Sequence, residues 1–477
     1  MKSDELPGIP RNWIEFAAGI NRRLSSMPAW NQLRFLAENK DEVRRQACGR
    51  ELLARLLSAD YQSVPARTRQ NMQRLQDTES VVVAADLRAS LFGGPMGQTL
   101  KCMTLIKICE DLFNLGVSAV PVCWMSAGAQ VHDSQWSINV MDHDAELHRM
   151  HLSAPDGTVL LPDDPLPQDS VSALISKIEK IGRGSFDNRV LDILRAAYNA
   201  EATLISASAR FLTDLMGEWG LVVLHHQAES LVSISDEALK PFETGIARIQ
   251  SRCRERESES AAEDRVVTSL KTAFPNQLLR SFIMPVIANV VDFNELDSFA
   301  EVLPVFDELG YVQPKLWPCV SATIVDARAR RTLEKYNLNL DEFFAGKEEI
   351  LKSITISHSV SEKLKDLELE VERRMAEVDI QVPDPAEFLK MRDSSRERLI
   401  YQIGKLRNRF DSADSRKKET MGRHVRHAGN LLAPNREMQQ NQLSMLGFLL
   451  HHTQAILGLL HEKLDIFNFN HQILFMD

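Results

Sequence analysis

The chain has 477 residues, of which 44% are hydrophobic and 26% charged, and its formal net charge is −10 at pH 7. This composition is ordinary for a soluble globular protein of two or three domains, and the acidic balance argues against nucleic acid or an anionic membrane as a partner. The acidic start of the chain lacks a signal-peptide core, the six cysteines show no C-x-x-C spacing, and no apolar run reaches membrane-spanning length. We therefore expect a cytoplasmic protein.

The first part of the chain predicts an N-terminal helical segment and then the start of a parallel sheet. Residues 1–75 carry apolar side chains at helical spacing. A buried strand follows at Val81–Ala85, a turn at Phe92–Gly97, a helix to about Leu115 and a second strand at Val117–Trp124. This order predicts a right-handed crossover, and ligands of such sheets bind beyond the carboxyl ends of the strands.

Further strand signals follow, and we expect the last two of them to join the same parallel sheet. They lie at Trp136–Leu161, Leu221–Leu224, Met284–Val291 and Lys315–Ile324, with a predicted helix at Leu296–Leu309 between the last two. We expect an α/β fold with a Rossmann-like core at residues 76–345 and an insertion at about 160–270.

The apolar pattern changes to a near-heptad seam from about Leu364. Pro383–Pro385 interrupts the seam, which resumes from Leu399 to Ala413. This predicts an antiparallel helical coiled-coil arm over residues 346–435, before a C-terminal helical segment at 436–477. The second helix of the arm is basic, which suits either an anionic partner or a solvated face with ion pairs along the helix.

The glycine turn is the first candidate for a binding site. Gly93 and Gly94 precede a helix that follows a strand directly, and N–H groups at such a helix start suit phosphate or carboxylate. Lys101 is close enough to the start of this helix to assist in binding such an anion. The spacing matches neither G-x-G-x-x-G nor a Walker A loop, so a purely structural tight turn is the alternative.

The loop after the second strand holds the second candidate. His132 can act as a proton shuttle or a phosphate contact, with Asp133 orienting it, although a histidine in a surface loop is the alternative. The other histidines lack cysteine or carboxylate partners at ligand spacing, so we predict no metal site.

Several motifs, taken in order, resemble the bacillithiol-biosynthesis cysteine-adding enzymes, a family of cysteine ligases. The motifs extend over almost the whole chain: Leu91–Pro95 with Lys101, Ala119–Trp124, Gly220–Leu224, Ser321–Thr323, Leu338–Phe344 and Phe467–Leu474.

The resemblance implies a Rossmann-like core with inserted segments, a homodimer formed through the coiled-coil arm, and a site for ATP or ADP. It implies a ligase that joins the carboxyl group of cysteine to the amino group of glucosaminyl malate. The implied residue roles are an anion site at Gly93, Gly94 and Lys101, proton or phosphate handling by His132 and Asp133, an amine contact at Glu295, and a facing wall of Ser321 and Thr323.

The motif loops nevertheless depart from the family pattern at the strand ends. Ala85–Arg88 replaces T-G-Q-Q, His132 and Asp133 are displaced within their loop, Val291–Glu295 keeps one glutamate of G-G-P-G-E, and Cys319 replaces an arginine. Because the packing segments match and the loops do not, the alternative function is a catalytically degenerate family member with a binding or regulatory role.

Overall fold

The structure is a computed structural model with two compact units, which are described separately. One unit comprises Met1–Ile324 and Glu437–Leu474, and the other comprises Val325–Arg436 and Phe475–Asp477. The described residues are 11–25, 33–47, 49, 51, 53–54, 57, 64–126, 132–154, 157–182, 188–225, 274–296, 299, 306–307, 309–354, 359–378 and 385–476.

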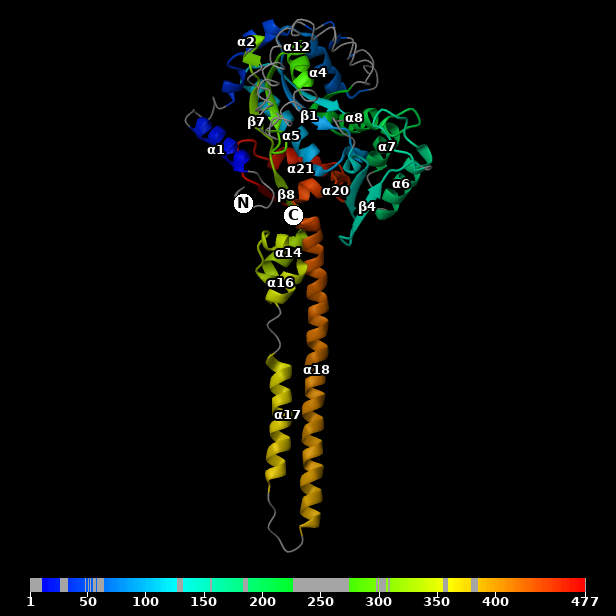
Figure 1. Ribbon diagram of the computed structural model, residues 1–477, viewed down its shortest axis with the longest axis vertical. Coiled ribbons are helices and arrows are strands. Elements are labelled where there is room, and N and C mark those ends of the chain that lie inside the picture. Colours follow the sequence, from blue (N-terminus) through cyan, green and yellow to red (C-terminus); the bar gives the residue numbers. More distant parts are fainter. Residues whose placement is uncertain are drawn as a thin grey trace, which may run out of the picture. The chain divides into compact units, whose positions relative to one another are not determined.

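The first unit is built around a five-stranded parallel sheet in the order β5-β2-β1-β6-β7. Strands β1 and β7 of this sheet are labelled in Figure 1. Its strands are β1 (Val81–Arg88), β2 (Ala119–Ser126), β5 (Val222–Leu224), β6 (Val286–Val291) and β7 (Lys315–Pro318). The chain winds from β1 to one side through β2 and to the other side through β6, so the topological switch point lies between the carboxyl ends of β1 and β6. The predicted Rossmann-like parallel core is confirmed.

Helices cover both faces of this sheet. On one face, α4 (Ala66–Gln76) and α12 (Phe274–Ile283) pack in a single apolar cluster with alternate residues of β1 and β2. On the other face lies α5 (Met96–Asn114), where Cys102 contacts Cys123 of β2 with 3.8 Å between the two sulfurs. The strands are buried on both sides, which explains their continuous runs of apolar residues.

Smaller elements complete this unit. They are α1 (Arg11–Ser25), η3 (Arg34–Ala37), α2 (Lys40–Gln46), η4 (Leu91–Gly93), η5 (Asp133–Gln135), β3 (Ser137–Met141), β4 (Leu147–His151), α6 (Gln168–Ile181), α7 (Asn188–Ala197), α8 (Leu204–Leu215), η6 (Gly217–Trp219), α19 (Gln439–Gln442), α20 (Met445–His452) and α21 (Ala455–Lys463). Strands β3 and β4 form an antiparallel hairpin. In the described part of the chain, no helix has the length and apolarity needed to cross a membrane.

One predicted strand is in fact two. The sequence predicted a continuous strand over Lys315–Ile324, but β7 ends at Pro318 and β8 covers Ala322–Val325, paired with β9 (Gln472–Phe475) in a separate sheet. The division occurs because the N–H of Val320 donates to the Thr104 hydroxyl of α5 instead of continuing the ladder. Most of the helix predicted at Leu296–Leu309 lies outside the described residues.

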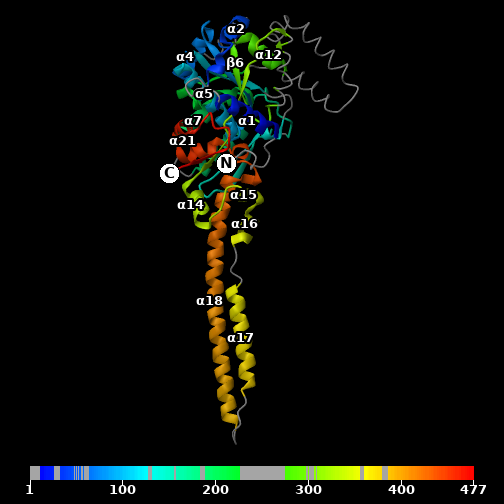
Figure 2. The same ribbon diagram turned by 90° about the vertical axis from the view of Figure 1, so that its left-hand side faces the viewer.

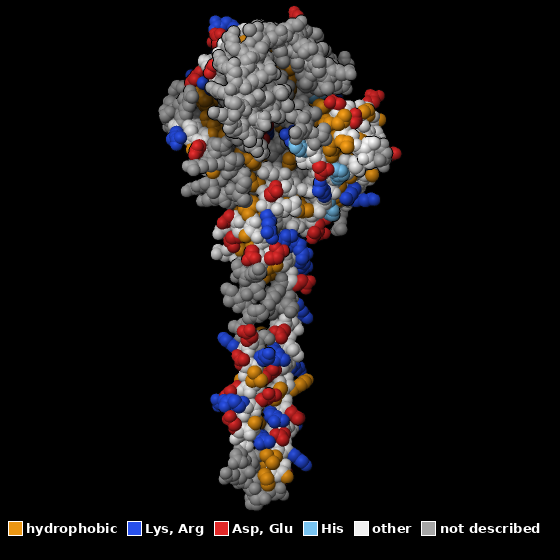
Figure 3. All heavy atoms as spheres, in the orientation of Figure 1, with side chains coloured by type: hydrophobic (Ala, Val, Ile, Leu, Met, Phe, Trp, Pro, Cys, Tyr) orange, Lys and Arg blue, Asp and Glu red, His pale blue; other side chains and the backbone are white. Residues whose placement is uncertain are grey.

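The second unit contains the predicted helical hairpin. Its helices are α14 (Ala327–Tyr336), α15 (Glu342–Ala345), α16 (Lys347–Ile354), α17 (Ser359–Glu377) and α18 (Ala386–Leu432), with the short turn η8 (Pro434–Arg436). Figures 1 and 2 show α17 running alongside α18, and an ion pair between Arg407 and Glu368 joins them. Acidic, basic and apolar side chains are interspersed over this arm (Figure 3). The coiled-coil arm is confirmed.

Candidate functional site

A buried lysine lies beneath two carboxylates at the switch point of the sheet. Lys101, on the second turn of α5, donates from Nζ to Glu295 Oε2 at 2.5 Å and to Asp292 Oδ2 at 3.3 Å. Both acidic residues belong to the turn that follows β6, and the N–H of Asp292 also donates to Glu295 Oε2 at 3.1 Å. The side chain of Lys101 is 4% exposed, whereas those of Asp292 and Glu295 are 36% and 25% exposed. The carboxylates therefore form the accessible rim of the cluster.

The charges of this cluster are strongly perturbed. Burial acts to lower the pKa of Lys101, but Asp292 and Glu295 together outweigh it and raise that pKa, so the ammonium stays charged. Burial raises the pKa of Glu295 to about 7 against the opposing effect of Lys101, with Asp292 and Asp86 adding to the rise. Glu295 can therefore gain or lose a proton near neutral pH, as a general base must.

A second ion pair lies at the end of β1. Arg280 of α12 is 1% exposed and donates to both carboxylate oxygens of Asp86, at 2.7 and 3.1 Å. Among the described residues, neither Arg280 Nε nor the buried Oδ1 of Asn289 on β6 has a hydrogen-bond partner. Asp86 lies in the segment where the family pattern has T-G-Q-Q. Its negative charge is balanced by Arg280, on a helix that is distant in sequence.

The connection between β7 and β8 brings a thiol beside this cluster. Cys319 Sγ lies 3.9 Å from the Thr104 hydroxyl, and Thr104 also holds the next residue, Val320, through its N–H. Burial raises the pKa of the Cys319 thiol to about 12, although Lys101 acts to lower it. The thiol therefore remains protonated at neutral pH and is a poor nucleophile.

Ser321 and Thr323 meet at a buried histidine. His471 Nδ1 lies 2.6 Å from Ser321 Oγ, and its Nε2 lies 2.8 Å from Thr323 Oγ1. Ser321 Oγ also donates to Gln440 Oε1 at 2.9 Å. All of these contacts are satisfied when the Thr323 hydroxyl donates to Nε2 of His471 and Nδ1–H of His471 donates to Ser321. This arrangement requires a neutral imidazole. Burial agrees with this state, because it lowers the pKa of His471 to about 4.

The glycine turn is packed into the core. Gly93 and Gly94 have φ values of 82° and 68°, and a Cβ on Gly93 would lie 2.8 Å from the Phe211 ring of α8. The N–H of Phe92 donates to the Tyr198 hydroxyl at 2.5 Å, and the N–H of Met96 donates to a backbone carbonyl at 2.7 Å. The turn thus has internal partners, and its role in anion binding stays a prediction.

His132 and Asp133 are exposed and do not form a pair. Asp133 binds Arg149 at 2.6 Å and lies 3.5 Å from His151, both on β4. The same loop does approach the end of β1, because Gln135 Nε2 donates to the carbonyl of Ala89 at 3.1 Å. The first two residues of the predicted 130–135 cluster lie outside the described part of the chain.

The structure thus brings Lys101 together with Glu295, and Ser321 together with Thr323. Sequence reasoning missed Asp292 and the Asp86–Arg280 pair. The position of Asp292, directly after a buried strand, was a usable signal. The described residues hold no group of three or more His, Cys, Asp or Glu side chains that suits a metal ion.

Comparisons with known proteins place this chain in a family. Residues 22–269 match the model described as "Bacillithiol biosynthesis BshC, N-terminal Rossmann-like domain", and residues 322–476 match "Bacillithiol biosynthesis BshC, C-terminal coiled-coil domain". A Koribacter versatilis protein named "Putative cysteine ligase BshC" is 23% identical over 93% of this chain and 93% of its own length.

Two further relatives carry the same name. The Cytophaga hutchinsonii protein is 22% identical over 90% of this chain and 89% of its own length. The Solibacter usitatus protein is 21% identical over 84% of this chain and 86% of its own length. The resemblance inferred from the motifs is confirmed: this chain belongs to the BshC family of bacillithiol biosynthesis, with both its Rossmann-like and its coiled-coil domain.

Proposed function

We propose that this protein is a cytoplasmic carbon–nitrogen ligase that joins the carboxyl group of cysteine to the amino group of glucosaminyl malate. The observation that carries the proposal is the cluster of Lys101, Asp292 and Glu295 at the switch point of a Rossmann-like sheet, in a chain of the BshC family. In open parallel sheets, this position is where ligands bind.

Amide formation requires a deprotonated amine beside an activated carboxyl group. The rim of the cluster is anionic, so Asp292 suits an incoming ammonium group. Glu295, with its pKa raised to about 7, suits the removal of a proton from that ammonium before attack. Lys101 keeps its charge and holds both carboxylates in place.

We assign the remaining predicted residues to the surroundings of this cluster. Ser321 and Thr323, whose hydroxyls contact His471, follow Cys319 in the chain and are assigned to the wall that faces the cluster. Gly93, Gly94, His132 and Asp133 remain candidate contacts for an anionic group. We further propose ATP as the co-substrate that activates the carboxyl group, and a homodimer formed through the α17–α18 arm.

The decisive experiment follows the product by mass spectrometry. Purified protein is incubated with cysteine and glucosaminyl malate, with and without ATP, and we expect an adduct that equals both substrates less one water. Glu295→Gln should lower turnover by about 100-fold or more, since it removes the proposed base. Glu334→Gln, an exposed glutamate on α14, is the matched control and should leave turnover unchanged.

The same assay tests the alternative of a degenerate member with a binding role. That alternative draws on the ion pairs Asp86–Arg280 and Lys101–Glu295, which satisfy the charges of the site internally. Absence of product, under conditions where a relative from the family forms it, would reject the ligase and leave the binding role.

A further inference from the structure

The carboxyl end of β1 carries an exposed arginine. Arg88 is the last residue of this strand, and its side chain is open to solvent. In the part of the chain that the structure describes, its guanidinium has no ion pair and no hydrogen bond. Because a guanidinium is always protonated in proteins, Arg88 places a full positive charge at the edge of the sheet where ligands of such folds bind.

The neighbouring cations at this edge are already paired. The side chains of Arg280 and Lys101 are 1% and 4% exposed, and carboxylates hold both of them. Asp86, two residues before Arg88, accepts hydrogen bonds from Arg280 on both of its carboxylate oxygens. The negative charge of Asp86 is therefore compensated, and Arg88 remains available to an anion from solution.

A hydroxyl lies beside the guanidinium. The register of β1 and β2 places Arg88 opposite Ser126, so the two residues lie on neighbouring strands about 4.8 Å apart and project from the same face of the sheet. Ser126 is partly exposed, and its hydroxyl has no hydrogen bond with a described residue. A guanidinium and a hydroxyl in this arrangement can both donate to one carboxylate.

The Lys101 cluster lies at the same edge. Strands β1 and β6 are adjacent, about 4.8 Å apart, and their register places Ala85 opposite Val290. Arg88 and Asp292 follow this pair by three and two residues, at the carboxyl ends of the two strands. A molecule that binds the cluster through one group therefore has Arg88 close enough to hold a neighbouring group.

The edge thus offers charges of opposite sign to a ligand. The accessible carboxylates of Asp292 and Glu295 suit an ammonium group, whereas Arg88 suits a carboxylate. In the acceptor of the proposed reaction, the amino group and the malate are attached to adjacent carbons of the sugar ring. One molecule of this acceptor can therefore contact the carboxylates and the arginine together.

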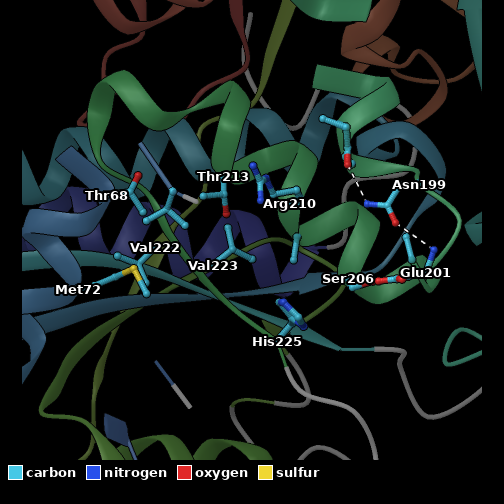
Figure 4. Close-up of a pocket in the computed structure, with 15 residues that line it drawn as sticks. Thr68, Met72, Asn199, Glu201, Ser206, Arg210, Thr213, Val222, Val223 and His225 are labelled. Atoms are coloured by element: carbon cyan, nitrogen blue, oxygen red, sulfur yellow. Dashed lines mark hydrogen bonds between the residues drawn. The ribbon is translucent and has the colours of Figure 1, made fainter. Parts of the chain in front are cut away.

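A cavity of about 260 Å³ beside the edge strand β5 is a different place (Figure 4). The described residues that line it include neither Arg88 nor Ser126. Thr68, Met72 and Val222, which do line it, are almost fully buried and offer a ligand little surface. The exposed end of β1 is therefore the better candidate for a ligand with charged groups.

We propose that Arg88, assisted by Ser126, binds a carboxylate of the malate group of the acceptor. This contact positions the amino group of the acceptor at Asp292 and Glu295, and it selects amines that carry an anionic group beside the nitrogen. The inference rests on the ligase function proposed above, because that function supplies the identity of the acceptor.

The test is calorimetric titration of the full chain with two probes: glucosaminyl malate, and methyl glucosaminide, which has the amine but no carboxylate. Arg88→Gln should weaken binding of glucosaminyl malate by about tenfold or more, since it removes a hydrogen bond between charged groups. Ser126→Ala should weaken it by about threefold. Both variants should leave the binding of methyl glucosaminide unchanged.

The controls separate a ligand contact from a structural role. Arg88→Gln introduces the residue of the family pattern at an exposed position, so the variant should fold. Arg426→Gln changes an exposed arginine of α18 and should bind both probes as the parent does. In steady-state assays, Arg88→Gln should raise the KM for glucosaminyl malate and leave the KM for cysteine unchanged, whereas Glu295→Gln lowers kcat.

The titration does not require turnover, so it can fail separately from the ligase assay. Tight binding that depends on Arg88, without any product, would refute the ligase and leave the carboxylate site in place. The inference is overturned if glucosaminyl malate does not bind the parent, or if Arg88→Gln binds it as tightly as the parent does. An equal loss of methyl glucosaminide binding in Arg88→Gln would also overturn it, because the role of Arg88 would then be structural.

Discussion

At the scale of single residues, the environment of Glu295 decides what its carboxyl group can do. An exposed glutamate is a weak base at neutral pH, but burial raises the pKa of Glu295 to about 7 even with Lys101 beside it. Lys101, meanwhile, is kept charged by its two acidic partners. The same three side chains thus supply a fixed charge and a titrating group within one hydrogen-bonded cluster.

A pH dependence of the ligase reaction follows from this environment. The deprotonated form of Glu295 is the base, so kcat/KM should rise with pH through about pH 7 and level off above it. Steady-state rates over this range measure the effect. In Glu295→Gln the residual rate should lose this rise, while the Glu334→Gln control keeps it. A Glu295→Gln profile with the parent's rise would assign the titration to another group.

The buried imidazole of His471 should make the folded protein less stable as the pH is lowered. Burial lowers its pKa from 6.5 to about 4 in the folded chain, so between these values the unfolded chain binds a proton that the folded chain does not. The free energy of unfolding should therefore fall as the pH is lowered, by about 2 kcal/mol between pH 7 and pH 5. Urea denaturation at the two pH values measures this difference.

The variant His471→Gln isolates that contribution. It should be less stable than the parent at pH 7, because Ser321 and Thr323 lose their partner. It should also show a smaller loss between the two pH values. His143→Gln, which changes an exposed histidine, should keep the parent's pH dependence. An unchanged dependence in His471→Gln would contradict the assignment.

At the scale of elements, the turn η4 is fixed by close packing against α8. Gly93→Ala should destabilise the protein by roughly 2–5 kcal/mol, because a positive φ and a contact of 2.8 Å with Phe211 act together. Gly157→Ala also has a positive φ, of 76°, but meets nothing within 4 Å, so it measures the backbone strain alone. Equal losses in the two variants by urea denaturation would show that the contact with Phe211 contributes nothing.

The sequence predicted elements better than it predicted contacts between them. Runs such as Val81–Ala85 are apolar and β-branched throughout, and that pattern identified the buried strands of the sheet. The pairing of Asp86 with Arg280 and the meeting of Ser321 with His471 join segments distant in sequence. No local pattern encodes such pairs, because they arise when the sheet and its covering helices assemble. The division of Lys315–Ile324 was missed for the same reason, since Thr104 of α5 causes it.

At the scale of the whole molecule, the proposed homodimer depends on how much of the apolar surface of α18 is left uncovered by α17 of the same chain. α18 spans 47 residues, about 70 Å, and α17 spans 19. The apolar side chains spaced along one stripe of α18 remain 44–60% exposed: Phe388, Met391, Leu399, Leu406 and Phe410. A seam left half exposed over this length is typical of a surface that packs against further helices.

We therefore expect light scattering coupled to size-exclusion chromatography to give twice the mass of the chain. Leu406→Glu places a charge in the exposed stripe, so it should shift the protein toward a monomer and make the dimer more dependent on protein concentration. Tyr401→Glu changes a more exposed residue, 65% accessible, on the opposite side of α18 and is the matched control. A monomeric parent would refute the dimer, and a larger effect of Tyr401→Glu would instead place the interface on that side of the helix.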